Sequence, residues 1–544
     1  MIFLSTILLS MFITLALIPL TKGLAVKLNI IDIPDARKAH LAPTPKNGGI
    51  AVTLGAIIPL LLWAPINGLG KAILIGVGII VLFGLIDDII DLNYKWKFAA
   101  QLVAALIVIL YGDLQIKSLG MLLPEGVLLP SWLAIPLTVL VIVGITNAIN
   151  LSDGLDGLAG GICLFSFICI GYLAFQAENI TIALFSAAIA GGLFGFLRFN
   201  TYPAILFMGD AGSQFLGFTA ITLSLGLTQT NTPLSPMLPL LLIGFPVLDT
   251  VTVMSERIAR GRSPFIADRN HFHYKLIRLG LFHTESVLVI YILQAFLVTS
   301  AFILRFYNDW LILVCYLIFS GIIIIGFFIA DKIGWQFKRI SVADRIVKGR
   351  FAVLKEKNIL IKISYRIIKY GIPLLLLVSC FLPANIPNYF IYFSIGMVAL
   401  IAVTGFIKNG RIGGLRLSLY LTIPFIVYQS ELSMPSWMNH NLQLAYNISF
   451  GILIIFVIMT LKFSRREGFK STPMDFLILF IALVVPNLPD ARIQSYHMGL
   501  IAAKIIVFFF SYDVLIAELR GDLTKIRLAT MAALGVIIIK GLVL

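Results

Sequence analysis

Runs of about twenty apolar residues recur along the whole chain, and they restrict its fold more than any other feature. A run of this length matches a helix that crosses roughly 30 Å of hydrocarbon. Inside hydrocarbon every backbone N–H and C=O needs a partner within the protein, which leaves helices and closed barrels as the spanning structures. Hydrophobic residues make up 59% of the chain and charged residues 12%. The sequence therefore predicts an all-α, polytopic helical membrane protein.

We expect about 18 transmembrane helices. The first run has no basic start and no small-residue cleavage pattern, so we interpret it as a retained span and not as a signal peptide. The expected spans lie at residues 3–20, 48–65, 72–86, 98–111, 135–146, 158–175, 181–197, 215–227, 238–254, 287–306, 311–330, 372–382, 390–407, 417–428, 445–461, 476–485, 498–510 and 528–544.

The expected spans fall into two groups separated by a basic segment. Residues 1–330 form a membrane core, residues 331–371 a basic cytoplasmic or interfacial segment, and residues 372–544 a further set of helices whose role the sequence does not indicate. The basic segment fits either an amphipathic helix on anionic lipid or a plain cytoplasmic linker. The net charge of +15 follows from the excess of Lys and Arg in cytoplasmic loops, and we expect no nucleic-acid partner.

Cysteine usage excludes several kinds of site. All four cysteines lie inside apolar runs, at Cys163, Cys169, Cys315 and Cys380. Their placement indicates no disulfide framework, no metal knuckle and no thiol chemistry.

Four polar clusters interrupt the apolar sequence, each at the end of an apolar run. They occupy residues 87–91, 147–157, 207–212 and 268–273. With the N-terminus outside, alternating spans return all four clusters to the face that also holds the basic stretch 21–47. A basic excess marks the cytoplasmic face, so we expect a single cytoplasmic active site. Charged groups at a membrane boundary need a functional reason, because they are costly in hydrocarbon.

The residue types in these clusters suit one kind of chemistry. Their ligands are oxygens with no thiolate among them, a set that favours Mg²⁺, with Mn²⁺ as the alternative. Lys97 and Arg269 stand near the acids and could hold phosphate oxygens. The acids in question are Asp87, Asp88, Asp91, Asp153, Asp156 and Asp210. A metal-dependent reaction on a phosphate substrate is the resulting prediction.

Taken in order, these motifs resemble those of the polyprenyl-phosphate N-acetylhexosamine-1-phosphate transferases. Members of this family are integral membrane enzymes that move a sugar 1-phosphate from a UDP-sugar to a lipid phosphate and release UMP. The resemblance covers residues 21–281. It rests on the Asp-Ala-Arg-Lys-Ala-His and Thr-Pro-Lys-Asn-Gly-Gly block at 35–49, the pair 87–88, Asn-x-x-Asn-x-x-Asp-Gly-x-Asp-Gly from Asn147, the stretch 200–210 and the histidine loop after Asp268.

The resemblance implies a role for each matched residue. Asp210 would ligate Mg²⁺ directly, Asp87 and Asp88 would act on the lipid phosphate and complete the metal site, and Lys97 would hold phosphate. Asp156 would face the uracil, Phe207 would stack on it, and Asn200 would lie near the diphosphate. The implied substrate-binding residues are Asn147, Asn150, Asp153, Asp156, Asn200, Phe207, Arg269, His271, His273, Arg37 and His40. Tyr274 stands where many members carry another histidine.

The resemblance also implies substrates, partners and a place in the cell. The histidine loop favours transfer of GlcNAc-1-phosphate to undecaprenyl phosphate as the first membrane step of cell-surface glycan synthesis, over the branch that uses UDP-MurNAc-pentapeptide. The expected location is the bacterial inner membrane. We also expect a homodimer. Glycan-assembly proteins that bind residues 372–544 are further expected partners. Direct attack by the lipid phosphate is the favoured route, and a covalent aspartyl-phosphate intermediate stays open.

Two other interpretations compete with this one. The acids at 153, 156 and 210 could simply cap the helices that follow them. A lipid-phosphate transporter or flippase would also carry membrane carboxylates and basic loops, but it predicts charges near mid-span. The clusters lie at span ends, which favours an enzyme.

Overall fold

The computed structural model describes residues 2–33, 43–124, 126–230, 232–263, 270–336, 359–406, 411–463, 498–518 and 523–543. Within these residues the regular secondary structure is helical, apart from one small pair of strands. The chain divides into two compact units, unit 1 with the described residues 2–336 and unit 2 with the described residues 359–543.

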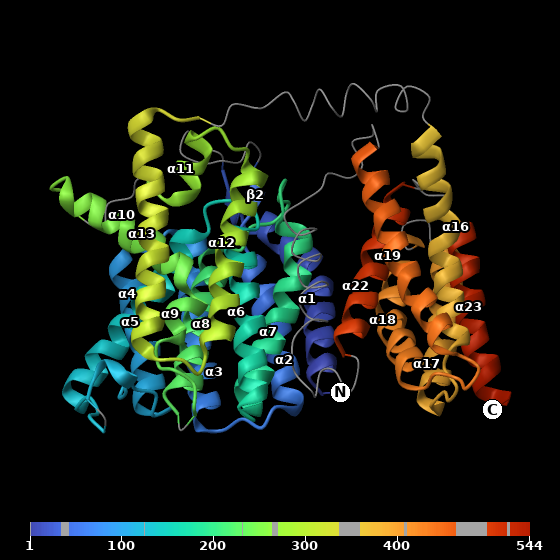
Figure 1. Cartoon of the computed structure of the whole chain (residues 1–544), viewed down its shortest axis with the longest axis horizontal. Helices are drawn as coiled ribbons and strands as arrows, with labels where there is room; N and C mark the ends of the chain where they lie inside the picture. The colour runs from blue at the N-terminus through green and yellow to red at the C-terminus, as the bar shows by residue number, and fades with distance from the viewer. Residues whose placement is uncertain are drawn as a thin grey trace. The chain divides into compact units, whose positions relative to one another are not determined.

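Unit 1 is a bundle of long helices (Figure 1). Strands β1 (Ile31–Asp32) and β2 (Thr44–Pro45) pair antiparallel, with Ile31 opposite Pro45. Its helices are α1 (Ile2–Lys27), α2 (Gly48–Trp63), α3 (Gly68–Ile90), α4 (Tyr94–Leu110), α5 (Ser131–Ser152), α6 (Leu158–Gln176), α7 (Ile180–Asn200), α8 (Gly209–Thr228), α9 (Leu238–Leu242), α10 (Gly244–Ala259), α11 (Phe272–Arg278), α12 (His283–Leu304) and α13 (Asp309–Ile333), with a 3-10 turn at Gly120–Leu122.

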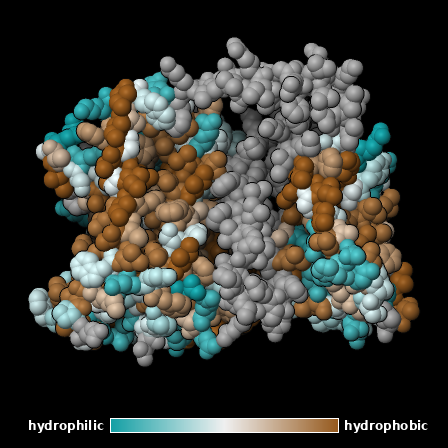
Figure 2. Space-filling model, viewed as in Figure 1, coloured by the Kyte–Doolittle hydropathy of each residue, from teal (hydrophilic) through white to brown (hydrophobic). Residues whose placement is uncertain are grey.

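The centre of unit 1 is formed by α6, α7 and α8. The most apolar stretches of α6 and α7 are 78% buried, whereas that of α13 is 17% buried. From Ala211 to Thr228 every residue of α8 is buried. Figure 2 shows hydrophobic side chains over the outer faces of the peripheral helices, with hydrophilic ones gathered towards the ends. This distribution is the one expected when apolar side chains face lipid.

Eleven helices in the described part of the chain are long and apolar enough to cross a membrane. They are α1, α3, α5, α6, α7, α12 and α13 in unit 1 and α16, α17, α19 and α23 in unit 2. This result confirms an all-α, multi-pass membrane protein, although it does not confirm the count of about 18 spans. The expected span at 476–485 lies outside the described residues.

The prediction of one continuous span over residues 238–254 is wrong, because the helix breaks between α9 and α10. Pro246 has no N–H to continue the helical ladder. Side chains from other helices satisfy the backbone groups at the break. Gln294 donates to the carbonyl of Leu242 at 2.8 Å, Ser166 donates to the same carbonyl at 2.7 Å, and Tyr316 donates to that of Gly244 at 2.9 Å. In Figure 1, α10 then runs outward from the bundle.

Unit 2 is a second helical bundle with an apolar core of its own. Its described helices are α16 (Ile359–Phe381), α17 (Asn388–Phe406), α18 (Arg411–Leu432), α19 (His440–Phe463), α22 (Met498–Glu518) and α23 (Thr524–Val543). Fully buried Ile372, Ile423 and Phe508 belong to one continuous hydrophobic cluster. Because unit 2 has this core, it packs as a compact body distinct from unit 1.

Candidate active site

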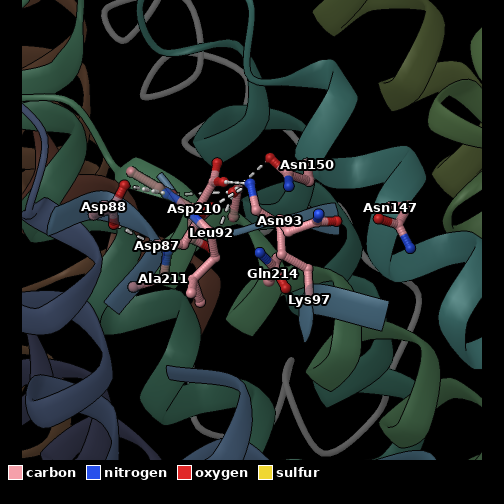
Figure 3. A network of polar contacts seen from close by, with 12 residues as sticks. Asp87, Asp88, Leu92, Asn93, Lys97, Asn147, Asn150, Asp210, Ala211 and Gln214 are labelled. Atoms are coloured by element: carbon pink, nitrogen blue, oxygen red, sulfur yellow. Dashed lines mark hydrogen bonds and ion pairs between the residues drawn. The ribbon is translucent and has the colours of Figure 1, made fainter. Parts of the chain in front are cut away.

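Helix ends from widely separated parts of the sequence meet at one end of unit 1. Asp87 and Asp88 lie in the last turn of α3, Lys97 in the first turn of α4 and Asp210 in the first turn of α8. Figure 3 shows their side chains converging on one another. The helix α3 ends because Asp91 adopts the left-handed conformation at φ 54°, and Asn93 then caps α4 by accepting from the backbone N–H of Lys95. This short reversal carries Lys97 back toward the acids.

Lys97 joins two of the acids through one ammonium group. Its Nζ lies 3.1 Å from Oδ2 of Asp210 and also forms an ion pair with Oδ2 of Asp87. The side chains of Lys97 and Asp210 are 28% and 32% exposed, whereas that of Asp87 is 2% exposed. The second oxygen of Asp87 accepts from the backbone N–H of Leu92 at 2.7 Å. The cluster is therefore open to a ligand on the side of Asp210 and Lys97.

Asp88 has a different environment from Asp87. Its two carboxylate oxygens accept from the backbone N–H groups of Asp210 at 3.0 Å and of Ala211 at 3.3 Å. These N–H groups would otherwise be unsatisfied at the start of α8, so Asp88 caps that helix from another part of the chain. Gly209, at φ +75°, lets the backbone approach Asp88 this closely. The capping role weighed for Asp210 is thus filled by Asp88.

A layer of amide side chains lies next to the acidic cluster. Asn147 donates to Gln101 at 2.6 Å, and Gln101 donates to Gln214 at 2.9 Å. Asn150 accepts from the hydroxyl of Ser213 at 3.1 Å. In Figure 3, Asn147 lies apart from the acids, while Asn150 lies beside them. The structure therefore brings Asn150 into the cluster and places Asn147 in a neighbouring network between helices.

The turn at residues 153–157 is held from two sides. Asn200, which is 2% exposed, accepts from the N–H of Gly157 at 3.0 Å and donates to the carbonyl of Leu206 at 3.0 Å. Asp156 accepts from the N–H of Ala204 at 2.8 Å. The turn after α5 and the segment after α7 thus lie side by side. Phe207 is half-buried in this second segment, which β2 holds through the bond from the N–H of Phe207 to the carbonyl of Pro45 at 2.8 Å.

Asp153 occupies the position directly after α5. Its removal from water raises its pKa to about 7, and the negative charges of Asp210 and Asp156 act in the same direction. Asp153 therefore shares its electrostatic surroundings with the acidic cluster. A cation bound nearby would favour its charged form.

The histidine loop packs against the same turn. His273 is 2% exposed, and a Cβ at Gly154 would collide with its imidazole. Burial lowers the pKa of His273 to about 4 and so keeps the ring neutral. Its Nε2 is buried without a partner among the described residues. The ring of His271 stacks on that of His273 with centroids 5.8 Å apart.

Three predicted residues cannot be placed. Arg37, His40 and Arg269 lie outside the described residues. Asn147, Asn150, Asp153, Asp156, Asn200, Phe207, His271 and His273 are all placed, in the arrangement given above.

Sequence reasoning missed three polar residues that the structure brings to this end. Asp249 in α10 binds His271, His283 at the start of α12 accepts from the N–H of Asp156 at 3.2 Å, and Gln101 links Asn147 to Gln214. The ring of Tyr202 lies 4.6 Å from that of His283. The sequence could have indicated Asp249 as a functional residue, since it is a single carboxylate inside an apolar run. No sequence pattern indicated His283 or Gln101, because their partners are far away in the sequence.

The acidic cluster fits a divalent cation through two of its carboxylates. In the described part of the chain, no group of three or more His, Cys, Asp or Glu side chains is gathered closely enough to hold a metal ion. Asp87 and Asp210 nevertheless face a single cation, the Lys97 ammonium. Two carboxylates fit Mg²⁺, which usually completes its shell with waters and substrate phosphates. Asp88 fits less well, because both of its oxygens already accept backbone N–H groups.

Comparison with known proteins agrees with this chemistry. Residues 71–228 match the model of glycosyl transferase family 4. A probable undecaprenyl-phosphate N-acetylglucosaminyl 1-phosphate transferase of Bacillus subtilis (strain 168) is 37% identical over 305 residues, which cover 56% of this chain and 85% of the relative. The undecaprenyl-phosphate alpha-N-acetylglucosaminyl 1-phosphate transferase of Escherichia coli (strain K12) is 31% identical over 326 residues, covering 58% of this chain and 88% of the relative.

The matched region and the site together define a membrane-embedded phosphoglycosyltransferase. The chain belongs to the family of polyprenyl-phosphate N-acetylhexosamine-1-phosphate transferases. The relatives account for little more than half of its length.

Proposed function

We propose that this protein transfers N-acetylglucosamine 1-phosphate from UDP-N-acetylglucosamine to undecaprenyl phosphate and releases UMP. The observation that carries the proposal is that Lys97 forms ion pairs with both Asp87 and Asp210 and is partly exposed. Both substrates are anions, and bringing them together is the main obstacle to the reaction. A partly exposed ammonium beside two carboxylates can draw in phosphate and leave oxygen ligands for a metal.

Mg²⁺, which we propose is held by Asp210 together with Asp87, would neutralise charge on the diphosphate when bound. The chain's own residues supply the rest of the chemistry. Lys97 would attract and orient phosphate oxygens, and Asp87 would take a residual proton from the lipid phosphate. Asp88 would fix the first turn of α8 and hence the direction of Asp210.

The proposed reaction is a direct displacement. An oxygen of the lipid phosphate forms a bond to the β-phosphorus, and the bond from that phosphorus to the oxygen bridging to the α-phosphate breaks. UMP leaves with the bridging oxygen, and the product is a lipid diphosphate sugar. The turn at 153–157, the segment at 200–207 and the histidine loop would form the nucleotide-binding wall, since the turn contacts both the segment and the loop.

The proposal is tested with purified protein, undecaprenyl phosphate, Mg²⁺ and a panel of UDP-sugars, with UMP and the lipid product as readouts. We expect both products with UDP-N-acetylglucosamine. Release of UMP only with UDP-MurNAc-pentapeptide would assign the protein to the other branch of the family. Absence of UMP with every sugar would refute the transferase proposal. Formation of one UMP per protein molecule, and no more, without any lipid phosphate would replace direct displacement with a covalent intermediate.

We also propose that the active site faces the cytoplasm at the inner membrane of a bacterium. The basic excess at 21–47 supports this orientation. Lys95 is exposed near the site, and Asp113 is exposed beyond the other end of α4. With Lys95→Cys, a membrane-impermeant maleimide should label inverted vesicles only, and with Asp113→Cys it should label right-side-out vesicles only. The reverse pattern would place the site outside.

A further inference from the structure

Asp249 is a buried carboxylate with no part in the reaction described above. It is 1% exposed and lies in the second turn of α10, the helix that follows the break after α9. Both of its oxygens are engaged by the histidine loop. Oδ2 lies 2.9 Å from Nδ1 of His271, and Oδ1 accepts from the backbone N–H of Phe272 at 2.8 Å. A buried carboxylate needs such partners, and here they come from one dipeptide.

The contact fixes which ring nitrogen of His271 carries a hydrogen. An ionised carboxylate only accepts hydrogen bonds, so Nδ1 of His271 must donate to it. That leaves Nε2 to face a ligand, as an acceptor in the neutral ring or as a donor in the imidazolium. Among the residues that the structure describes, Nε2 of His271 has no hydrogen-bond partner. The orientation of one ring nitrogen thus sets the role of the other.

The residues around Asp249 fix its position relative to the histidine loop. The polar side chains at the helix break fix the start of α10, with Phe245 donating its N–H to Gln294 at 3.3 Å. The ring of Phe272 packs against those of Phe245 and Phe327, at centroid distances of 5.8 and 4.9 Å. Further along α10, Glu256 pairs with Lys275 at 2.5 Å. The start of α11 is therefore attached to α10 at two points.

His271 belongs to the histidine loop of the nucleotide-binding wall proposed above, and its ring lies near the turn at 153–157. Its ring stacks in parallel on that of His273, with an angle of 9° between the planes, and His273 contacts Gly154 in the turn at 153–157. The ring of His273 therefore lies between His271 and that turn. At this separation, His271 can reach a phosphate group of a nucleotide bound at the turn.

We propose that Asp249 is a positioning residue of the transfer reaction, holding His271 with Nδ1 protonated and presenting Nε2 to a phosphate oxygen of the UDP-sugar. This inference rests on the proposed function. Asp249 also balances the positive charge that His271 acquires when Nε2 is protonated and donates to the phosphate. The arrangement is a carboxylate that orients a histidine, in the way that carboxylates orient metal-bound histidines.

The kinetic test compares Asp249→Asn with Glu256→Gln. The amide introduced by Asp249→Asn keeps an acceptor for the N–H of Phe272, but its NH₂ group would donate to Nδ1 of His271 and reverse the tautomer. Because the amide is neutral, it also no longer balances the positive charge of a ring that donates from Nε2 to the phosphate. We expect Asp249→Asn to lose roughly 10- to 100-fold in kcat/KM. Glu256→Gln weakens the other attachment of the loop and should lose less than about threefold. Equal losses in the two variants, or none in Asp249→Asn, would overturn the proposal.

A spectroscopic test reads the tautomer without turnover. The chain has six histidines, so the imidazole signals of ¹⁵N-histidine-labelled full-length protein can be assigned, that of His271 by its loss in His271→Gln. We expect a hydrogen on Nδ1 in the wild type, a hydrogen on Nε2 in Asp249→Asn, and a shift of the wild-type Nε2 signal when UDP is added. A wild-type ring protonated on Nε2 alone, or a signal that UDP leaves unmoved, would refute the proposal.

The two tests separate this inference from the proposed function. Failure of the transfer reaction with every UDP-sugar would overturn the function while the tautomer could still be measured. A wild-type His271 with the wrong tautomer would remove the positioning role of Asp249 and leave the transferase assignment intact.

Discussion

Each unit of the protein contains a lysine paired with a carboxylate, and the two pairs differ in what surrounds them. In unit 1, Lys97 lies between Asp87 and Asp210 at helix ends, and its side chain is 28% exposed. In unit 2, Lys504 pairs with Glu431, and their side chains are 3% and 1% exposed. Aromatic rings enclose Lys504, whose Nζ lies 4.1 Å from the ring centroid of Tyr446 and 5.4 Å from that of Phe450.

The comparison shows that access, and not the ion pair itself, distinguishes a candidate site from a packing element. The open pair in unit 1 can exchange its partners for phosphate or metal, since solvent reaches it. The closed pair in unit 2 lies inside the bundle, where Oε1 of Glu431 pairs with Lys504 and losing either partner would leave a buried charge. Variants of both units can test this difference.

Asp210→Asn should reduce turnover by about 10⁴-fold, or about 5.5 kcal/mol of transition-state stabilisation. The change removes a negative charge where the metal and the Lys97 ammonium would be held, while the amide keeps the shape of the side chain. UMP release by purified protein measures the effect, and an unchanged melting temperature is the control. If Asp210→Asn kept wild-type turnover at ordinary Mg²⁺ concentrations, Asp210 would have no role in the site.

Lys504→Met should lower the free energy of unfolding by about 4 kcal/mol and leave UMP release unchanged. The single change leaves Glu431 buried without its partner. The matched double variant, Lys504→Met with Glu431→Leu, should recover most of the stability, because an apolar pair of similar volume replaces the ions. Unfolding followed by circular dichroism in detergent checks both. If Lys504→Met lost activity at full stability, the pair in unit 2 would be functional and the comparison would fail.

Acid should loosen the histidine loop of unit 1. Burial lowers the pKa of His273 from 6.5 to about 4, so the unfolded loop binds a proton before the folded one does. Stability is therefore fully present above about pH 6.5 and falls as the pH drops toward 4, by about 3 kcal/mol at about 1.36 kcal/mol for each pKa unit. Hydrogen exchange of the α11 amides measures the loss. The same slope in His273→Gln would assign the effect to another group.

Removal of unit 2 should have the smallest effect on the reaction. A chain ending at Lys338 retains every residue of the described site, so we expect UMP release within about threefold of the full chain, or about 0.6 kcal/mol. The same truncation in cells tests whether unit 2 binds glycan-assembly proteins. Normal surface glycan in cells that carry the truncated chain would refute that role. A loss of turnover after truncation would mean that the reaction needs unit 2 as well as unit 1.

Much of the fold and of the site could be predicted because both depend on local sequence. Apolar runs predicted the long helices, since a hydrocarbon environment leaves the backbone few alternatives. Polar residues at the ends of those runs predicted Asp87, Asp88, Asp153 and Asp210 as one group, because alternating spans bring their ends to a common face. The break between α9 and α10 was missed, because its stability depends on Ser166, Gln294 and Tyr316 from other helices.

The sequence by itself determined the class of protein, its membrane helices and the acids at their ends, because hydropathy and residue type act over a few neighbouring residues. Only the tertiary structure decided how those acids differ. It directed Asp88 to the backbone of α8, left Asp87 and Asp210 to share Lys97, and joined Asp249 to His271. These roles depend on which atoms lie within roughly 3 Å across helices distant in sequence, and hydrogen-bond geometry of that kind has no signature along the chain.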